Sequence, residues 1–501
     1  MSLQSKIANF IKDLREQKEM TQTDFAELLG TSQSAVARME KGEQNFSTEM
    51  LAKISHALNR KILTIKNSVD FKIEGGQTLS GSIQTNTSKN GAMGLLCASL
   101  LNKGRTILHG IPRIEEVNRI LEVLESIGVS VKWIGQNSLE INPPKELDLG
   151  NINAVSARKT RTILMFIGPI IHLFKNFSIP NSQGCKLGKR SISAHLYALE
   201  NMGVKIKTTN TTYDIKVGEL RPSEIVMYEA GDTACENILM AAAKIKGKTV
   251  IKFASANYMV QEVANFLTKL GVRVDGIGTT TMTVYGVEEI DQNIEYTNSE
   301  DPTETMMLLT AAIVTSSSIT ITRCPIDFLE LELLKLEKMG FKYTKSKTYL
   351  SHNGLTKLVD ITTKPSKFKA LPDKIYSQPY PGINMDNLPF FVPIAALAEG
   401  TTLIHDWSYE NRAIYFMELT RLNVNMILAD PHRVYVEGPN ELQAAQVVCP
   451  PALRPATIIL LAMLGANGTS ILRNVYSINR GYEQIAERLN SIGAKITVIE
   501  E

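Results

Sequence analysis

The stretch LESIGVSV at residues 124–131 recurs five more times along the chain, at intervals of 68 to 83 residues. The other copies are LENMGVKI (199–206), LTKLGVRV (267–274), LEKMGFKY (336–343), LTRLNVNM (419–426) and LNSIGAKI (489–496). Each copy predicts a helix that ends at Gly or Asn and continues into a strand, because Gly and Asn tolerate a left-handed backbone and β-branched residues favour strands. A period of this length indicates an internal structural repeat.

A second recurring pattern precedes these copies: an apolar helix, then Gly or another small residue, then a strand. Examples are LLCASLLNKGRTILHGIP (95–112), MAAAKIKGKTVIKFAS (240–255), PIAALAEGTTLIHDWS (393–408) and LAMLGANGTSILRNVY (461–476). One unit is therefore βαβαββ-like, and it is too small to bury a full core by itself. Six units divide into two groups of three, so we predict an α/β fold of two lobes with a ligand-binding cleft between them.

Residues 1–66 carry a different pattern of four short helices, and we expect a small all-α domain there. In TQTDFAELLGTSQSAVARMEKG (21–42), Thr21 and Ser32 begin two helices that Gly30 and Gly42 end. Two short helices joined by a tight turn are a helix-turn-helix. Polar residues at the helix starts and on the outer face are predicted to contact DNA: Gln22, Ser32, Gln33, Ser34 and Arg38.

The stretch 21–42 resembles the phage-repressor-like (Xre) helix-turn-helix family, with residues 51–58 as the closing helix. The resemblance implies DNA binding through residues 20–42. We also expect a homodimer, because one head offers only one half-site. Ten Lys and Arg stand against eight Asp and Glu within residues 1–66. This near balance leaves a second interpretation open, a helical module that binds protein.

Composition excludes several classes of protein. The 501 residues are 44% hydrophobic and 21% charged, with 54 Lys and Arg against 51 Asp and Glu, so the chain is globular in composition and is not a polybasic nucleic-acid coat. The five cysteines are widely spaced and form no CxxC pair, so we expect neither a disulfide framework nor a metal site. No apolar run approaches the roughly 18 residues of a membrane span, and we expect a cytoplasmic protein.

Several short motifs in the repeat region carry polar chemistry. SKNG (88–91) places a compact cation, Lys89, beside the amide of Asn90, and RKTR (158–161) ends in Arg161 before an apolar helix. In QGCKLGKR (183–190), glycines make a flexible loop and three cations surround Cys185, which favours the reactive thiolate. One aspartate and three arginines come from four further motifs, MDN (385–387), ENR (410–412), LR (453–454) and RGYE (480–483).

Together, the six units and these motifs resemble the enolpyruvyl transferase family over residues 70–501, and within it the enzymes that act on UDP-N-acetylglucosamine. The resemblance implies transfer of an enolpyruvyl group from phosphoenolpyruvate to the 3-hydroxyl of UDP-N-acetylglucosamine or a related nucleotide sugar. It implies no metal or organic cofactor. We expect lobe 1 to comprise residues 67–88 and 300–501, and lobe 2 to comprise residues 89–299 with the Cys185 loop.

The resemblance also implies residue roles. Cys185, assisted by Lys89, would protonate the methylene carbon of phosphoenolpyruvate, and Asp386 would be the base for the acceptor hydroxyl. The predicted catalytic residues are Lys89, Cys185, Asp386 and Arg480, and the predicted substrate-binding residues are Asn90, Arg161, Arg190, Arg412 and Arg454. His195 also matches a family position, but we expect it to be structural.

The chain departs from the family pattern at several positions. Ala452 and Asn479 replace aspartates beside the LR and RGYE motifs, Ser193 replaces an aspartate associated with uracil recognition, Pro302 replaces an arginine, and Asn257-Tyr258-Met259 replaces an acidic segment. The change at Ala452 bears on turnover, and the changes near the nucleobase and sugar bear on the acceptor. Two functions therefore stay open: an active transferase with a DNA-binding head, and a nucleotide-sugar sensor that regulates transcription.

Overall fold

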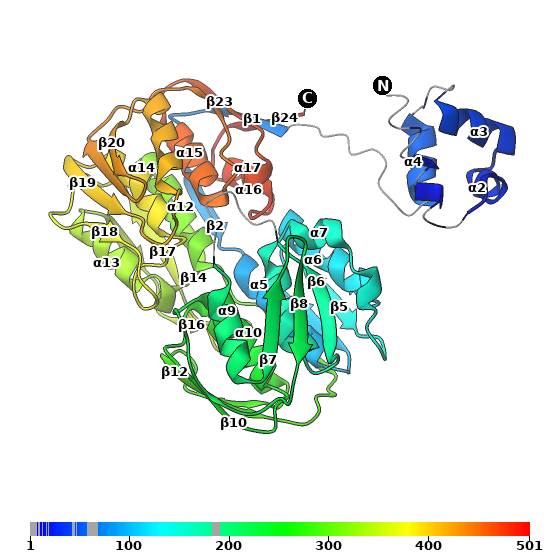
Figure 1. The fold of residues 1–501 in the computed structure, drawn as a ribbon. Helices are drawn as coiled ribbons and strands as arrows, with labels where there is room; N and C mark the ends of the chain where they lie inside the picture. Colours follow the sequence, from blue (N-terminus) through cyan, green and yellow to red (C-terminus); the bar gives the residue numbers. More distant parts are fainter. Residues whose placement is uncertain are drawn as a thin grey trace. The chain divides into compact units, whose positions relative to one another are not determined.

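The computed structural model describes residues 8, 11–12, 14–16, 18, 20–42, 46, 48–57, 69–182 and 191–500. The chain divides into two compact units, a head at Met1–Asn67 and a body at Ser68–Glu501. Figure 1 colours the chain along its sequence, from blue at the N-terminus to red at the C-terminus. Across these described ranges, no helix is both long enough and apolar enough to cross a membrane.

The head contains the predicted helix-turn-helix. Thr21 and Asp24 form a capping box at the start of the first described helix, and Gly30 ends that helix with φ 64°. Phe25 and Val36 are fully buried in the core of the head. The described helices are α2 (Gln22–Leu29), α3 (Gln33–Lys41) and α4 (Thr48–Ala57). The predicted helical head is therefore confirmed.

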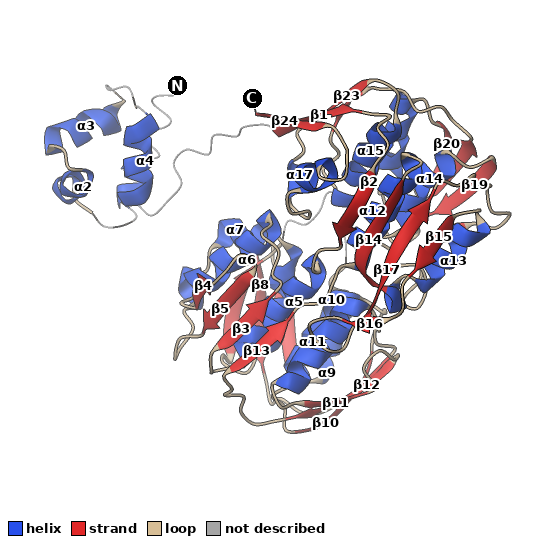
Figure 2. Cartoon of the chain, turned by 180° about the vertical axis from the view of Figure 1, so that it is seen from behind, coloured by secondary structure: helices blue, strands red, loops and turns tan. Residues whose placement is uncertain are grey.

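The body has two hydrophobic cores, which define two lobes. The core of lobe 1 combines residues 71–83 with residues 306–496, and the core of lobe 2 lies within residues 92–296. Three small sheets belong to each lobe, and helices fill its interior, as the opposite views of Figures 1 and 2 show. One inner helix, α12 (Pro302–Val314), is buried along its whole length.

Lobe 1 contains the sheets β22-β23-β1-β24, β15-β17-β14-β2 and β18-β19-β21-β20, with β16 beside β17. Its strands are β1 (Val69–Glu74), β2 (Ser80–Gln84), β14 (Ser318–Pro325), β15 (Lys342–Lys345), β16 (Tyr349–Leu350), β17 (Lys357–Lys364), β18 (Ile375–Tyr376), β19 (Gly400–His405), β20 (Asn425–Asp430), β21 (Arg433–Gly438), β22 (Gln446–Val448), β23 (Thr469–Arg473) and β24 (Ile496–Glu500). Its other helices are α13 (Glu330–Lys338), α14 (Phe391–Ala396), α15 (Leu453–Gly465), α16 (Tyr476–Asn479) and α17 (Ile485–Asn490), with short 3₁₀ turns η4 (Ile326–Phe328), η5 (Leu388–Phe390) and η6 (Ala413–Leu422).

Lobe 2 contains the sheets β11-β12-β10-β9, β13-β3-β5-β4 and β6-β8-β7. Its strands are β3 (Thr106–His109), β4 (Ser130–Trp133), β5 (Ser138–Asn142), β6 (Asn176–Pro180), β7 (Val204–Thr208), β8 (Thr212–Val217), β9 (Glu224–Val226), β10 (Gly247–Lys252), β11 (Arg273–Asp275), β12 (Thr281–Gly286) and β13 (Ile294–Thr297). Its helices are α5 (Lys89–Ala98), α6 (Glu115–Ser126), α7 (Ala154–Arg158), α8 (Ile167–Ile170), α9 (Ser193–Asn201), α10 (Asp232–Ala242) and α11 (Tyr258–Lys269), with 3₁₀ turns η1 (Ser99–Leu101), η2 (Leu149–Asn151) and η3 (Arg161–Phe166).

One pairing pattern recurs in five of the six sheets, a parallel strand pair followed by two antiparallel pairs. In lobe 2, for example, Ile225 pairs in parallel with Ile251, and Val250 pairs antiparallel with Thr283. The chain order around this sheet is β9–α10–β10–α11–β11–β12. The βαβαββ unit predicted from the repeat, and with it the two-lobed α/β fold, is confirmed.

Two chain segments connect the lobes, and they run side by side. The backbone N–H of Ser88 donates to the carbonyl of Ser299 at 2.7 Å, and that of Asp301 donates to the carbonyl of Asn86 at 2.8 Å. Lys89 directly follows one of these segments, so Lys89 and Asp301 both lie at the junction of the lobes.

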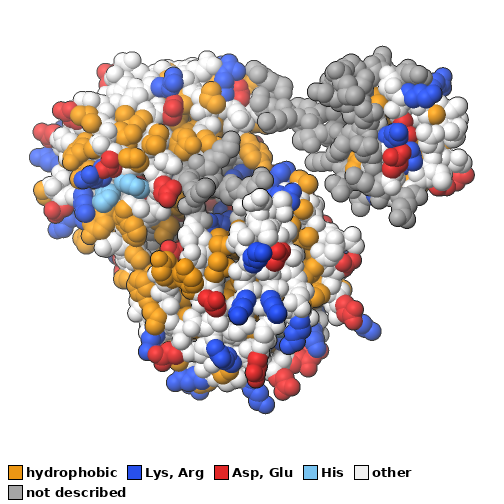
Figure 3. All heavy atoms as spheres, viewed as in Figure 1, with side chains coloured by type: hydrophobic (Ala, Val, Ile, Leu, Met, Phe, Trp, Pro, Cys, Tyr) orange, Lys and Arg blue, Asp and Glu red, His pale blue; other side chains and the backbone are white. Residues whose placement is uncertain are grey.

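The first and last strands of the body are neighbours in one sheet. Val69 pairs with Glu500 and Ile73 pairs with Ile496, and β1 lies between β23 and β24. On the face of the body shown in Figure 3, basic and acidic side chains are interspersed over both lobes, in agreement with the small net charge of +3.

Candidate active site between the lobes

Asp386 is the predicted base, and two arginines surround its carboxylate. Its Oδ2 lies 3.1 Å from Nη2 of Arg454, and its Oδ1 lies 3.9 Å from Nη1 of Arg412. Asp386 is held just before η5, where its N–H donates to Oδ1 of Asn384 at 2.8 Å. Burial alone would raise the pKa of Asp386, but Arg454, Arg412 and Lys89 outweigh burial and lower it to about 2. Without substrate, this carboxylate is ionised and is a weak base.

The buried side chain of Arg412 makes ion pairs and hydrogen bonds with neighbouring residues of lobe 1. Its guanidinium is 1% exposed and makes a two-pronged ion pair with Asp406, with Nε–Oδ2 at 2.5 Å and Nη2–Oδ1 at 2.8 Å. Nη2 also donates to the carbonyl of Met385 at 2.7 Å. These contacts fix the loop that carries Asp386, so Arg412 positions that carboxylate, and its predicted contact with substrate stays a prediction.

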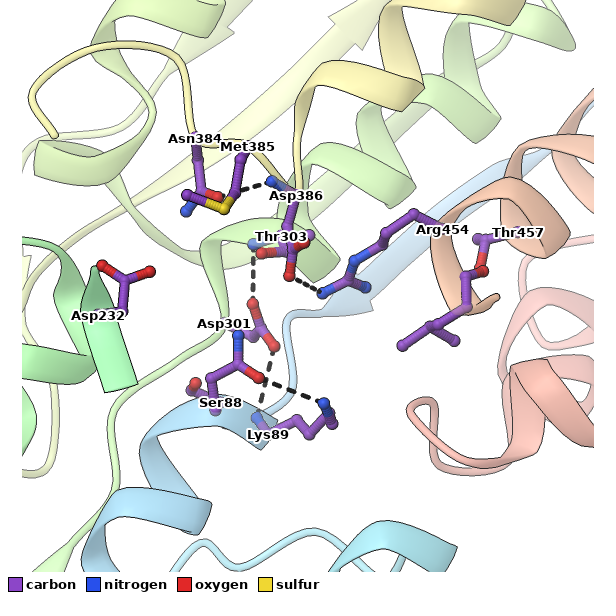
Figure 4. A network of polar contacts seen from close by, with 12 residues as sticks. Ser88, Lys89, Asp232, Asp301, Thr303, Asn384, Met385, Asp386, Arg454 and Thr457 are labelled. Carbon is purple, nitrogen blue, oxygen red and sulfur yellow. Dashed lines mark hydrogen bonds and ion pairs between the residues drawn. The ribbon is translucent and has the colours of Figure 1, made fainter. Parts of the chain in front are cut away.

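Arg454 is buried at the start of α15 and faces the site. Its Nη1 donates to the hydroxyl of Tyr482 at 2.7 Å, and Tyr482 belongs to the predicted RGYE motif. Its Nε has no hydrogen-bond partner among the residues that the structure describes. Tyr482 and Asp386 (Figure 4) thus accept from two of the five N–H groups of Arg454.

Lys89 and Arg480 converge on a carboxylate that the sequence did not single out, that of Glu116. Oε2 of Glu116 lies 3.1 Å from Nζ of Lys89 and 3.3 Å from Nη2 of Arg480. Burial alone would raise the pKa of Glu116, but the two cations lower it. Glu116 lies in the first turn of α6 in lobe 2, and Arg480 directly follows α16 in lobe 1. The ion pair therefore links the lobes.

The other residues predicted near Lys89 have defined partners. Asn90 donates from Nδ2 to the hydroxyl of Tyr258 at 3.1 Å, and its Oδ1 accepts from Nζ of Lys89 at 3.3 Å. The carboxylate of Asp301 accepts from the backbone N–H of Lys89 at 3.4 Å and from that of Thr303 at 2.8 Å. Figure 4 shows Lys89, Asp301 and Asp386 in succession across the junction.

Cys185 and Arg190 lie outside the described residues. Arg161 donates to the carbonyl of Ser191 at 2.9 Å, just after that segment. The four described cysteines are buried: Cys97, Cys235, Cys324 and Cys449. Burial raises the pKa of each of them, to about 12 for Cys324 and for Cys449, so none is a ready nucleophile or proton donor.

His195 is buried in α9 and is bonded within the protein. Its Nδ1 lies 3.1 Å from Nδ2 of Asn237, and its Nε2 lies 3.3 Å from the hydroxyl of Thr233. Burial, assisted by Arg161, lowers the pKa of His195 to about 3. Both ring nitrogens of His195 therefore have hydrogen-bond partners within lobe 2.

The departures from the family pattern have visible structural effects. Ala452 is buried just before α15 and gives that helix no side-chain cap. Asn257 caps α11 through a hydrogen bond to the N–H of Tyr258 at 2.9 Å, and it also donates to Oδ2 of Asp232 at 3.1 Å. Ser193 accepts a hydrogen bond from Ser191 at 2.8 Å.

Asp232 is a second residue that the sequence did not single out. It faces the junction from lobe 2, across from Asn384 and Met385 of lobe 1 (Figure 4). Burial raises the pKa of Asp232 to about 6, although hydrogen bonds from Ser255 and Asn257 oppose the rise. In the described part of the chain, no group of three or more His, Cys, Asp or Glu side chains is arranged to hold a metal ion.

The residues predicted to contact DNA fall into two sets. Ser32, Gln33, Ser34 and Arg38 are exposed on or beside α3. Gln22 is partly buried instead: its Oε1 accepts from Nε2 of Gln33 at 2.8 Å, and its Nε2 donates to the carboxylate of Glu40 at 2.9 Å. Gln22 therefore orients Gln33.

The fold and the charged residues at the lobe junction define an enolpyruvyl transferase, and the chain belongs to the EPSP synthase (3-phosphoshikimate 1-carboxyvinyltransferase) family, which matches residues 73–489. Residues 11–65 match the helix-turn-helix family. Among curated proteins, the chain is similar to the UDP-N-acetylglucosamine 1-carboxyvinyltransferases of Bradyrhizobium diazoefficiens, at 30% identity over 86% of this chain and 99% of the relative, and of Campylobacter jejuni, at 31% over 86% and 99%.

Solved structures with the same fold include the enolpyruvyl transferase NikO from Streptomyces tendae, with a TM-score of 0.75 and 21% identity over 87% of this chain and 100% of that one. An EPSP synthase from Acinetobacter baumannii has a TM-score of 0.69 and 17% identity over 86% and 100%. At these identities, the likeness concerns the fold.

Proposed function

We propose that the body transfers the enolpyruvyl group of phosphoenolpyruvate to the 3-hydroxyl of UDP-N-acetylglucosamine or a related nucleotide sugar, with release of phosphate. The relatives at 30–31% identity that carry this name support the proposal. The observation that carries it is the juxtaposition of Asp386 and Arg454 with the cluster of Lys89, Glu116 and Arg480. This arrangement offers a carboxylate base beside cations that suit a phosphate and a carboxylate.

The geometry suggests how the base becomes active. Arg454 holds the pKa of Asp386 low in the ligand-free protein. When the carboxylate of phosphoenolpyruvate engages Arg454, its negative charge offsets that of the arginine, so the pKa of Asp386 rises and the carboxylate accepts a proton more readily. Likewise, the substrate phosphate competes with Glu116 for Lys89 and Arg480.

The reaction then follows as addition and elimination. The acceptor oxygen bonds to C2 of phosphoenolpyruvate while its proton passes to Asp386, and C3 receives a proton from Cys185, which gives a tetrahedral ketal. The Cys185 thiolate then takes back a proton from C3 as the bond between C2 and the phosphate oxygen breaks, which restores the enol ether, and Asp386 returns its proton to the departing phosphate. The protein supplies an acid, a base and stabilising cations for these steps.

Phosphate release from phosphoenolpyruvate, measured across a panel of UDP-sugars and other nucleotides, tests the proposal. We expect acceptor-dependent release that Cys185→Ala and Asp386→Ala both reduce. Glu437→Gln, which alters an exposed carboxylate on β21, is the matched control and should retain the wild-type rate. Absence of release with every acceptor would overturn the proposed transfer.

A second candidate is a nucleotide-sugar sensor, favoured by Ala452 at a position where the family has an aspartate and by the helix-turn-helix head. In this function the body binds the nucleotide sugar without turnover, and the head binds DNA through α3. It requires different ligand affinities in the DNA-bound and free states. Titration of DNA in the presence and absence of UDP-N-acetylglucosamine tests it, and equal DNA affinities would contradict it.

A further inference from the structure

The charge of the chain is distributed unevenly, and its most basic segment forms part of one sheet of lobe 1. Residues 335–374 contain ten lysines and three acidic residues, a charge of +7, whereas the whole chain carries +3. The remaining residues therefore carry −4 in total. The basic segment includes β15, β16 and β17, and β15 is the edge strand of the sheet β15-β17-β14-β2 (Figure 2). A local excess of this size indicates a surface that suits an anionic partner.

Two rows of polar side chains cross the outer face of this sheet. The first row has a hydroxyl on each of the four strands, in the pairing order Ser82, Thr320, Thr362 and Thr344. In the next row, the exposed lysines Lys342 and Lys364 lie directly opposite each other. Ile321 and Ile361 alternate with the hydroxyl residues along their strands and are fully buried, so both rows lie on the solvent side of the sheet.

Acidic side chains do not neutralise the lysine pair. In the part of the chain that the structure describes, Lys342 and Lys364 form no ion pair, and Asp360 of β17 accepts a hydrogen bond from the tyrosine of β16 at 2.6 Å instead. On the sheet β11-β12-β10-β9 of lobe 2, by contrast, Lys252 pairs with Glu224 at 2.5 Å. Like charges directly opposite each other destabilise a sheet, and a bound anion would relieve that repulsion.

We propose that this face of lobe 1 binds the phosphate backbone of double-stranded DNA. Lysines and hydroxyls are side chains that contact DNA phosphates without reading the bases. Four strands spaced about 4.8 Å apart span about 14 Å, and phosphates follow one another about every 3.4 Å along the axis of one DNA strand, so the face can meet several of them. Neither row contains an apolar residue for insertion into a lipid surface. The helix-turn-helix match of the head favours the same partner, and the inference does not depend on the proposed transfer reaction.

Fluorescence-anisotropy titration of the full chain tests the inference on two duplexes of equal length, one selected from random sequences by the wild type and one unselected. The variant combines Lys342→Gln with Lys364→Gln. Each lost phosphate contact lowers the steepness of log K against log salt by about 0.9. The double variant should therefore lose about 1.8 in slope and bind both duplexes about 60-fold more weakly than the wild type at 0.1 M KCl, with the difference vanishing near 1 M.

Two matched variants control for charge and fold. Lys205 and Lys216 are also exposed and directly opposite each other, on β7 and β8 of lobe 2, and their joint replacement by Gln should leave slope and Kd unchanged. Lys342→Arg with Lys364→Arg keeps both charges and should retain the wild-type slope. A phosphate contact weakens binding to every sequence alike, so equal losses on the two duplexes separate this face from the head.

Several results would overturn the inference. They are an unchanged slope in the Lys342→Gln, Lys364→Gln variant while its near-UV circular dichroism matches the wild type, an equal loss in the lobe 2 control, and no binding of the wild type to either duplex. Loss of binding to phosphatidylserine vesicles without a loss on DNA would assign the lysines to a membrane surface instead. Self-association of the variant in sedimentation, with unchanged DNA affinity, would show that the lysines only protect an edge strand from pairing with another chain.

Discussion

Two aspartates face the same space between the lobes, and their carboxylates differ in charge environment. Asp386 of lobe 1 has Arg454 and Arg412 beside it, and its pKa is lowered to about 2. Asp232 of lobe 2 has only neutral hydrogen-bond donors, and burial raises its pKa to about 6. Both carboxylates are buried, so burial does not explain the difference between their pKa values. The cations beside Asp386 lower its pKa, and Asp232 has no such neighbour among its named partners.

Asp386→Asn is the change with the largest expected effect. Asparagine cannot take the proton of the acceptor hydroxyl, so we expect kcat for phosphate release to fall about 1,000-fold, within the usual range for loss of a general base. Asp386→Glu should recover part of the rate, because a carboxylate is restored at a shifted position. A rate for Asp386→Asn within threefold of the wild type would remove Asp386 from the role of base.

Glu116→Gln tests whether the carboxylate shared by Lys89 and Arg480 competes with substrate. The phosphate of phosphoenolpyruvate would no longer displace a charged partner, so its KM should fall. Lys89 and Arg480 would also lose the group that fixes them, and misplacement of a catalytic group by 1 Å can cost about 100-fold, so kcat should fall as well.

Steady-state kinetics with phosphoenolpyruvate as the varied substrate measure this split. The control is Glu115→Gln, since Glu115 is the adjacent residue and pairs with Arg119 at 3.1 Å instead. A rise in KM with unchanged kcat would show that Glu116 supports substrate binding and does not compete with it.

Asp232→Asn should stabilise the protein at high pH. The folded-state pKa of about 6 exceeds the ordinary value of 3.8, so the folded state binds the proton more tightly and stability falls as pH rises from about 4 to about 6. Above that window the charged carboxylate destabilises the fold, and the variant should be about 3 kcal/mol more stable than the wild type at pH 8. Near pH 4 the difference should vanish.

Denaturant titration followed by the fluorescence of Trp133 and Trp407, one in each lobe, measures the difference at about pH 2, 4, 6 and 8. For Asp386→Asn, we expect the opposite dependence of the free energy of unfolding on pH. The pKa of Asp386 is lowered from 3.8 to about 2, so its contribution to stability is present above about pH 4 and is lost as pH falls toward 2. Parallel pH profiles of stability for the two variants would contradict the conclusion that the pKa values of the two aspartates are shifted in opposite directions.

The smallest effect concerns the head. Gln33→Ala should lower the affinity for DNA about tenfold, the usual loss for one base-edge contact. Gln22→Ala should lose less, because Gln22 orients Gln33 from behind. Gel-shift titration on a duplex selected from random sequences by the wild type measures both, and phosphate release should remain unchanged. Unaltered DNA affinity in Gln33→Ala would favour the alternative of a protein-binding head.

The repeat and the head were predictable because their signals are local. Glycines at helix ends and alternating apolar residues recur within each unit, and Thr21 and Gly30 delimit a helix in a single stretch. The resemblance also indicated Lys89, Asp386 and Arg454, which the fold brings to the lobe junction.

The missing part of the site depends on contacts between distant segments. Glu116 meets Arg480 across 364 residues of sequence, and nothing within α6 distinguishes it from the neighbouring Glu115. Asp232 lies at the junction because lobe 1 residues, distant in sequence, form the opposite wall of the pocket that it lines. The ion pair of Arg412 with Asp406 was not predicted, because the two residues meet only after the loop between them folds back.

The pairing of β1 with β24 has a consequence for how such a chain can be assembled from parts. Since Val69 and Glu500 are cross-strand neighbours, an appendage joined at either end of the body would depart from places about 5 Å apart, the spacing of adjacent strands. Moving the head to the other terminus would therefore leave every strand pair of the body intact. A second domain can therefore be joined to either end of the body, or removed from it, without a change in the strand pairing of the body.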